Sequence, residues 1–171
     1  MKETIEQYKT RIQGYATGKE PLKVQASTPA KIERLIKRVP KAKLRKRPAP
    51  GKWSIAEILA HLEDAEIVIA YRMRTILGAP GTPIQAFDQD RWAEAENYAK
   101  RDPHDALAVF QKLRGTNVRL LKSLKPEQWK QFGIHSERGE ESVERISVMT
   151  AGHDINHLKQ IEAILAKPRK A

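Results

Sequence analysis

The feature that most limits the fold of this chain is the spacing of its apolar residues, which recur at helical intervals along most of the sequence. Apolar side chains at positions i, i+3, i+4 and i+7 share one face of an α-helix, whereas a half-buried strand alternates apolar and polar residues. No convincing alternation extends over more than a few residues here. The pattern therefore predicts an all-α protein without strands.

Capping residues, prolines and glycines divide this pattern into separate helices. Thr28 and Pro29 are typical of a helix start, because a capping side chain precedes a proline at the first helical position. Ser54 and Glu57 have the spacing of a capping box. The helices delimited by such signals are expected at residues 4–16, 28–40, 53–78, 90–99, 102–124 and 141–166, the last one ended by Pro168.

Four of these helices are long and their connections are short or medium, which predicts a four-helix bundle. A chain of 171 residues can bury a core of its own, so we expect a single domain over residues 1–171 with its bundle core at about 28–166. The short N-terminal helix should pack on the outside. The last helix carries a second apolar patch that needs a neighbour, either the first helix or a second subunit. This patch consists of Val148, Ala151, Ile155 and Leu158.

The formal net charge of +11 arises from two short segments. Nine basic residues and no acidic residue lie between positions 34 and 52, which include a proline-studded basic connection at 40–52. A basic tail at 167–171, which we expect to be flexible, adds three more, and the rest of the chain is balanced with 20 basic and 21 acidic residues. The nine are Arg34, Lys37, Arg38, Lys41, Lys43, Arg45, Lys46, Arg47 and Lys52.

A basic segment next to a helix can bind nucleic-acid phosphates, and such binding weakens steeply as the salt concentration rises. Segment 34–52 has no recognition motif, however, and its only aromatic neighbour is Trp53. A solvated linker explains the segment at least as well. Nucleic acid is therefore an alternative partner and not the expected one.

The absence of cysteine excludes disulfides, thiolate metal ligands and a cysteine nucleophile in this chain. No stretch approaches the roughly 18 uninterrupted apolar residues of a membrane span. The N-terminal segment MKETIEQYKTRIQGY has no apolar region of the kind found in signal peptides. We therefore expect a cytoplasmic protein that does not enter a membrane.

Two histidines lie four residues apart in the segment AGHDINHLKQ, residues 151–160. On a helix, His153 and His157 are about 40° apart and lie at the centre of the core-facing stripe. Each buried imidazole nitrogen without a partner costs on the order of 1–3 kcal/mol. Side chains at i and i+4 can converge on one metal ion, which would satisfy both rings.

A third metal ligand should come from another helix, and His61 in HLEDAE is the best placed, at the flank of its own apolar stripe. His104 at a helix start and His135 in an expected loop are weaker candidates. The alternative is that these histidines are hydrogen-bonded core residues. The spacing resembles the metalloprotease motif H-E-x-x-H, but Asp154 replaces the glutamate that acts as base there, which argues against a protease.

Three segments together resemble the DinB-like (damage-inducible) superfamily, which is similar to the metal-dependent hydrolases and thiol transferases. They are residues 48–66 (PAPGKWSIAEILAHLEDAE), 87–100 (FDQDRWAEAENYAK) and 151–165 (AGHDINHLKQIEAIL), within a resemblance that covers about 20–166. The resemblance implies an up-down-down-up bundle, frequent homodimers, and a divalent metal held by three histidines. In this sequence these are His61, His153 and His157.

The resemblance also bears on the reaction. Characterised members transfer low-molecular-weight thiols such as bacillithiol or mycothiol, or isomerise substrates with a thiol cofactor. Because this chain has no cysteine, a thiol would have to arrive as a cosubstrate. Three neutral imidazoles on a divalent ion, with zinc or nickel expected, leave one position open for water or substrate. A scaffold that binds metal without catalysis is the remaining alternative.

Several polar residues are candidates for supporting such a site. Asp64 and Glu57 lie one turn from His61, and either could orient its ring or could simply belong to a solvated helix face. Asp64 is also a candidate for a direct role in the reaction. Asp88, in a loop at 78–90 that is long enough to cover a site, could act as acid or base, although capping the following helix is the favoured interpretation. Two further residues on the third long helix could contact a bound anion. These are Arg114 and Asn117.

Overall fold

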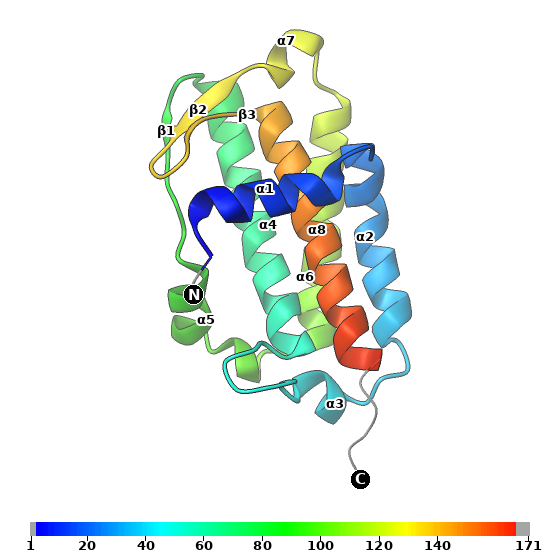
Figure 1. Ribbon diagram of the computed structural model, residues 1–171. Coiled ribbons are helices and arrows are strands. Elements are labelled where there is room, and N and C mark those ends of the chain that lie inside the picture. The colour runs from blue at the N-terminus through cyan, green and yellow to red at the C-terminus, as the bar shows by residue number, and fades with distance from the viewer. Residues whose placement is uncertain (1–2, 167–171) are drawn as a thin grey trace.

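The computed structural model describes residues 3–166 and shows four long helices packed side by side, with a shorter helix crossing them (Figure 1). Helices α2 and α8 run in one direction and α4 and α6 in the other (Figure 1). This is the up-down-down-up arrangement that the resemblance implies, and the prediction of a four-helix bundle is confirmed. The four helices are α2 (Pro21–Ile36), α4 (Ile55–Gly78), α6 (Pro103–Lys122) and α8 (Val143–Ala166).

Helix α1 (Ile5–Ala16) lies across the outer face of α8 (Figure 1). The crossing is so close that a Cβ added to Gly152 would lie 1.9 Å from the carbonyl oxygen of Ile12. Only glycine fits there, because any larger residue would push the two backbones apart. The second apolar patch of α8 therefore has α1 as a neighbour. A homodimer now rests on the resemblance alone and stays a prediction.

Helix α2 begins at Pro21, so the predicted start at Thr28 is wrong. Pro29 lies inside the helix and has no N–H, which leaves the carbonyl of Gln25 without its helical donor. Arg114 of α6 supplies the missing hydrogen bond, with its Nη1 3.1 Å from the Gln25 oxygen. A contact with another helix thus makes the internal proline tolerable.

The prediction of a protein without strands is also wrong, because three short strands form a small sheet. The strands are β1 (Pro83–Ile84), β2 (Phe132–His135) and β3 (Gly139–Ser142), with β1 parallel to β2 and β2 antiparallel to β3. Strands of two to four residues are too short to show alternation in the sequence. Because β3 uses residues up to 142, α8 begins at Val143, where the Ser142 side chain accepts a hydrogen bond from the Arg145 N–H.

The remaining connections contain short helices, namely α3 (Lys41–Arg45), α5 (Gln89–Ala95), the 3₁₀ helix η1 (Tyr98–Lys100) and α7 (Pro126–Trp129). The basic connection is not simply a solvated linker. Its Leu44 is buried in the core, Lys41 pairs with Asp102 at 2.5 Å, and Arg47 pairs with Glu57. The basic tail at 167–171 and the helix end assigned to Pro168 lie outside the described residues.

The interior of the bundle is divided into two apolar clusters. One lies near α3 and includes Ile36, Leu44, Leu59 and Phe110, and the other lies near the sheet and includes Met73, Ile76 and Leu121. Between them along the helices are buried polar side chains. These are Gln25, Glu66, Arg114, Asn117, Ser147 and Asp154. Within residues 3–166, no helix has the length and apolar character needed to cross a membrane.

Candidate metal centre

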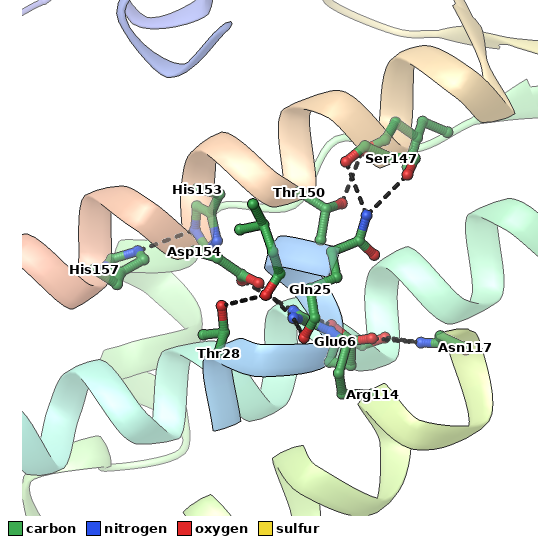
Figure 2. A network of polar contacts seen from close by, with 12 residues as sticks. Gln25, Thr28, Glu66, Arg114, Asn117, Ser147, Thr150, His153, Asp154 and His157 are labelled. Atoms are coloured by element: carbon green, nitrogen blue, oxygen red, sulfur yellow. Dashed lines mark hydrogen bonds and ion pairs between the residues drawn. The ribbon is translucent and has the colours of Figure 1, made fainter. Parts of the chain in front are cut away.

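The structure brings together the three histidines selected from the sequence. The Nε2 atom of His153 lies 2.9 Å from Nε2 of His61 and 3.0 Å from Nε2 of His157. One nitrogen from each ring lies within 4.8 Å of the other two. Two rings come from successive turns of α8 (Figure 2) and the third from α4, as the helical spacing predicted.

The cluster is buried on one side and open on the other. His61 is 1 % exposed and His157 is 5 % exposed, whereas His153 is partly exposed. In front of His153 and His157 is a pocket of about 560 Å³ whose walls include Tyr8, Arg11 and Lys52. A small molecule in this pocket would therefore reach the exposed side of the cluster.

Burial keeps the three rings neutral. It lowers the pKa of His61 well below the usual 6.5, and the nearby His157 adds to this effect. Burial also lowers the pKa of His153 well below 6.5 and that of His157 to about 4. All three imidazoles are thus in the form that binds metal ions at neutral pH.

The hydrogen bonding of the cluster is incomplete. The Gln160 side-chain oxygen lies 2.9 Å from Nδ1 of His157, so this nitrogen carries the proton and Nε2 presents a lone pair to the other rings. The buried Nδ1 of His61 has no hydrogen-bond partner in the described part of the chain. Three neutral rings with converging Nε2 atoms cannot fully satisfy one another, because each ring has only one donor and one acceptor.

A divalent cation fits this donor set. Two imidazole nitrogens on one tetrahedral zinc ion, each at about 2.0–2.1 Å, lie about 3.3 Å apart. The observed separations of 2.9 and 3.0 Å are a few tenths of an ångström shorter. Small rotations of the rings are enough to close this difference, so the three residues suit a common metal ion.

Aromatic side chains surround His61. The ring centroid of Trp53 lies 5.0 Å from that of His61, and the ring of Phe87 stacks on His61 with centroids 6.3 Å apart and an angle of 15° between the rings. Phe87 in turn contacts Trp92 in the middle of α5. The loop before α5 therefore does reach the site, and it contributes an apolar wall that limits the access of water.

The carboxylates expected to orient His61 have other partners. Asp64 accepts a hydrogen bond from the Tyr98 hydroxyl at 2.5 Å and pairs with Arg101. Glu57 completes the capping box by accepting from the Ser54 N–H at 2.8 Å. Since Nδ1 of His61 has no partner among residues 3–166, the prediction that either carboxylate orients this ring is wrong. Their partners come from segments distant in sequence or from the cap, which local spacing does not show.

Asp88 has the structural role that was favoured. Its side chain accepts hydrogen bonds from the N–H groups of Asp90 and Arg91, both at 3.1 Å, and so caps α5. A direct chemical role for Asp64 or Asp88 stays a prediction. Of the weaker histidine candidates, His104 lies in the first turn of α6, and His135 is buried in β2 instead of in a loop.

Arg114 and Asn117 bind carboxylates of the protein itself, so the predicted contact with a bound anion is wrong (Figure 2). Arg114 Nη2 lies 3.0 Å from Asp154 Oδ1 and 2.8 Å from Glu66 Oε2. Asn117 Nδ2 donates to Glu66 Oε1 at 2.7 Å. Burial acts to lower the pKa of Arg114, but Asp154 and Glu66 outweigh it and raise that pKa above its usual value. The guanidinium therefore stays charged.

Two groups at the site were not identified from the sequence. Gln160 orients His157, and Phe87 packs beside His61. The position of Gln160 on the same stripe as the histidines was a usable signal, since it lies one turn beyond His157. The position of Phe87 had no comparable local signal.

The fold and the three-histidine cluster define a helix-bundle protein with a candidate metal centre. Residues 26–161 match the DinB superfamily, and the chain belongs to it. It is 25% identical over 144 residues to "Putative metal-dependent hydrolase YfiT" of Bacillus subtilis (strain 168), a match that covers 82% of this chain and 81% of that protein. It is 29% identical over 122 residues to "Putative metal-dependent hydrolase OB0413" of Oceanobacillus iheyensis, covering 68% and 66%.

Two solved structures have similar folds. YfiT from Bacillus subtilis, described as a probable metal-dependent hydrolase with an unusual four-helix bundle topology, superposes with a TM-score of 0.78 at 23% identity, over 94% of this chain and 87% of that one. The mycothiol-dependent maleylpyruvate isomerase superposes with a TM-score of 0.63 at 12% identity, over 85% of this chain and 59% of that one. At these identities the similarity extends to the fold alone.

Proposed function

We propose that this chain is a metal-dependent enzyme in which His61, His153 and His157 hold one divalent cation, with zinc or nickel the expected ion. The observation that carries the proposal is the convergence of three neutral Nε2 atoms in a buried cluster that cannot satisfy its own hydrogen bonds. When bound, such an ion lowers the pKa of a coordinated water or thiol towards about 7 and so supplies a nucleophile at neutral pH.

The residues around the cluster have defined tasks in this proposal. Gln160 holds the proton of His157 on Nδ1 and keeps Nε2 free as a ligand. Trp53 and Phe87 exclude water from the side of His61. The substrate enters on the side of His153, where the pocket lies.

Water and a thiol cosubstrate are the two candidates for the activated group. Relatives named metal-dependent hydrolases support water. The similar fold of a mycothiol-dependent isomerase supports a thiol, which must come from outside because this chain has no cysteine. Parallel assays with ester substrates and with a thiol plus an electrophile would distinguish the two reactions.

Elemental analysis of tag-free protein purified without chelators tests the metal site. We expect about one equivalent of metal in the wild type and none in a His153→Ala/His157→Ala double variant. His104→Ala is the matched control, because this histidine lies outside the cluster. A folded wild-type protein that takes up no zinc or nickel when either is supplied would overturn the proposal.

A further inference from the structure

The three histidines come from two helices that pack weakly on each other. α4 supplies His61 and α8 supplies His153 and His157. α4 packs far more extensively on α6, and α8 on α2, than α4 and α8 do on one another. Direct packing between the two helices is therefore a poor determinant of the distance between His61 and the other two rings.

A single side chain from a third helix connects α4 to α8. Arg114 of α6 pairs with Glu66, five residues after His61 on α4, and with Asp154, the residue next to His153 on α8 (Figure 2). It also donates to the carbonyl of Gln25 on α2. Arg114 thus bonds to one residue from each of the other three bundle helices, and it is only 2 % exposed.

We infer that Arg114 is the positioning residue of the metal centre: by holding Glu66 and Asp154 on one guanidinium, it fixes the spacing of α4 and α8 and so keeps His61 opposite His153 and His157. This inference rests on the proposed function. The planar fork of arginine can bind two carboxylates only in a narrow range of relative positions. In a buried site, any shift of α8 against α4 would leave charged groups unpaired, which is costly.

The surroundings of Arg114 restrict it further. Pro29 removes the N–H that would otherwise compete for the Gln25 carbonyl, so this oxygen is available to Nη1. Asn117 holds the second oxygen of Glu66, and it accepts a hydrogen bond from Arg74 at 2.8 Å. The carboxylate of Glu66 is therefore held from two sides by α6.

A purely stabilising role accounts poorly for this arrangement. A buried ion-pair network contributes little net stability compared with apolar side chains of similar volume. Its particular contribution is a defined geometry, because a charged network has one satisfied arrangement whereas apolar side chains can slide past one another. The network defines the position of Asp154, which is the residue next to His153 of the cluster.

Two variants test the inference through metal affinity. Arg114→Lys keeps the charge but loses the fork, and the triple variant Arg114→Met/Glu66→Gln/Asp154→Leu removes the buried charges together so that the core can stay folded. We expect both to bind zinc about 10–100-fold more weakly than the wild type, as is typical when residues supporting metal ligands are lost. Competition with a chelator of known affinity gives the dissociation constants, and the visible spectrum of the cobalt form reports distortion of the ligand set.

Leu121→Ala is the matched control. Leu121 lies two turns beyond Arg114 on α6, in the apolar cluster near the sheet. The substitution therefore lowers the stability of the protein without altering the Arg114 network. Unchanged zinc affinity in both Arg114 variants would overturn the positioning role. The role would also be overturned if Leu121→Ala lost as much zinc affinity as an Arg114 variant with the same melting temperature. A wild-type protein that binds no metal would overturn the proposed function as well, so the two failures are distinguishable.

Discussion

Two buried polar groups lie side by side in this bundle, and their hydrogen bonding differs. In the Arg114 network, opposite charges are paired: both oxygens of Asp154 accept hydrogen bonds from Arg114, and Glu66 Oε2 lies 2.8 Å from Arg114 Nη2. Asn117 donates to Glu66 Oε1, and only Glu66 Oε2 and Arg114 Nε lack a hydrogen-bond partner in this network, among the described residues. In the histidine cluster, three nitrogens converge and Nδ1 of His61 has no partner in the described residues. The first group is complementary in charge, whereas the second consists of three neutral rings of the same kind.

The difference shows how a buried polar group can be assigned to structure or to function. Groups with opposite charges and matched donors and acceptors hold helices together without help. Polar groups of one chemical kind that converge in the interior leave some hydrogen bonds unmade, and this raises the free energy of the folded state. A bound ligand that supplies the missing partners removes this cost. His153 and Asp154 are adjacent in the sequence, yet they belong to different classes by this criterion.

The largest effect that separates the two groups should come from Asp154→Ala. The substitution leaves Arg114 charged and buried beside a single carboxylate, and breaking a buried pair in this way costs about 3–5 kcal/mol. His153→Ala should cost much less in metal-free protein, because that ring is partly exposed and neutral, so that its loss leaves no buried charge unpaired. Urea denaturation of both variants measures this, and equal losses of stability would refute the distinction.

The second effect is a dependence of stability on pH that belongs to the cluster. His157 has a pKa of about 4 in the folded protein against a usual value of 6.5, so the unfolded state binds more protons between these values. Metal-free protein should therefore lose stability as the pH falls from 6.5 to 4, by about 3 kcal/mol from this residue. His157→Gln should make the profile less steep over this range when both proteins are unfolded in urea at several pH values. Part of the pH dependence should remain, because burial also lowers the pKa of His61, His153 and His135. A profile unchanged by the substitution would argue against a neutral, buried ring.

The smallest effect concerns Gln160, whose side chain contacts the cluster from the surface. Gln160→Leu removes the acceptor that fixes the tautomer of His157, and we expect zinc affinity to fall by about tenfold. Stability of the metal-free protein should change by less than about 0.5 kcal/mol, as is usual for an exposed position. Titration with zinc and thermal unfolding test the two halves of this prediction. A stability loss without a change in affinity would place Gln160 with the structural groups.

Much of the fold could be predicted because it follows from local rules. The capping box of Ser54 and Glu57, the cap at Asp102 and the stripe that contains His153 and His157 all depend on residues within two turns of each other. The grouping of His61 with the other two histidines was predictable because polar rings on core-facing positions need partners in the core.

The errors occurred where distant residues replace a local rule. Pro29 looked like the start of a helix, but Arg114, far along the chain, supplies the hydrogen bond that the proline removes. Asp64 looked available to His61, but Tyr98 and Arg101 bind it instead. The strands near Gly133 pair with each other over only two to four residues, too few for a periodic signal.

The walls of the pocket combine the helices that carry the histidines with segments outside the bundle. Tyr8 and Arg11 belong to α1, Lys52 to the basic connection and Asp90 to α5, all of which lie around the bundle, whereas the rings are fixed on its long helices. Helix α1 packs tightly on α8 at Gly152, whereas Lys52 and Asp90 lie on segments where a substitution would change the pocket wall without altering the helices that carry the histidines. In the proposed enzyme, the outer wall of the pocket would therefore set the selectivity for a small molecule, and the long helices would set the geometry of the metal centre.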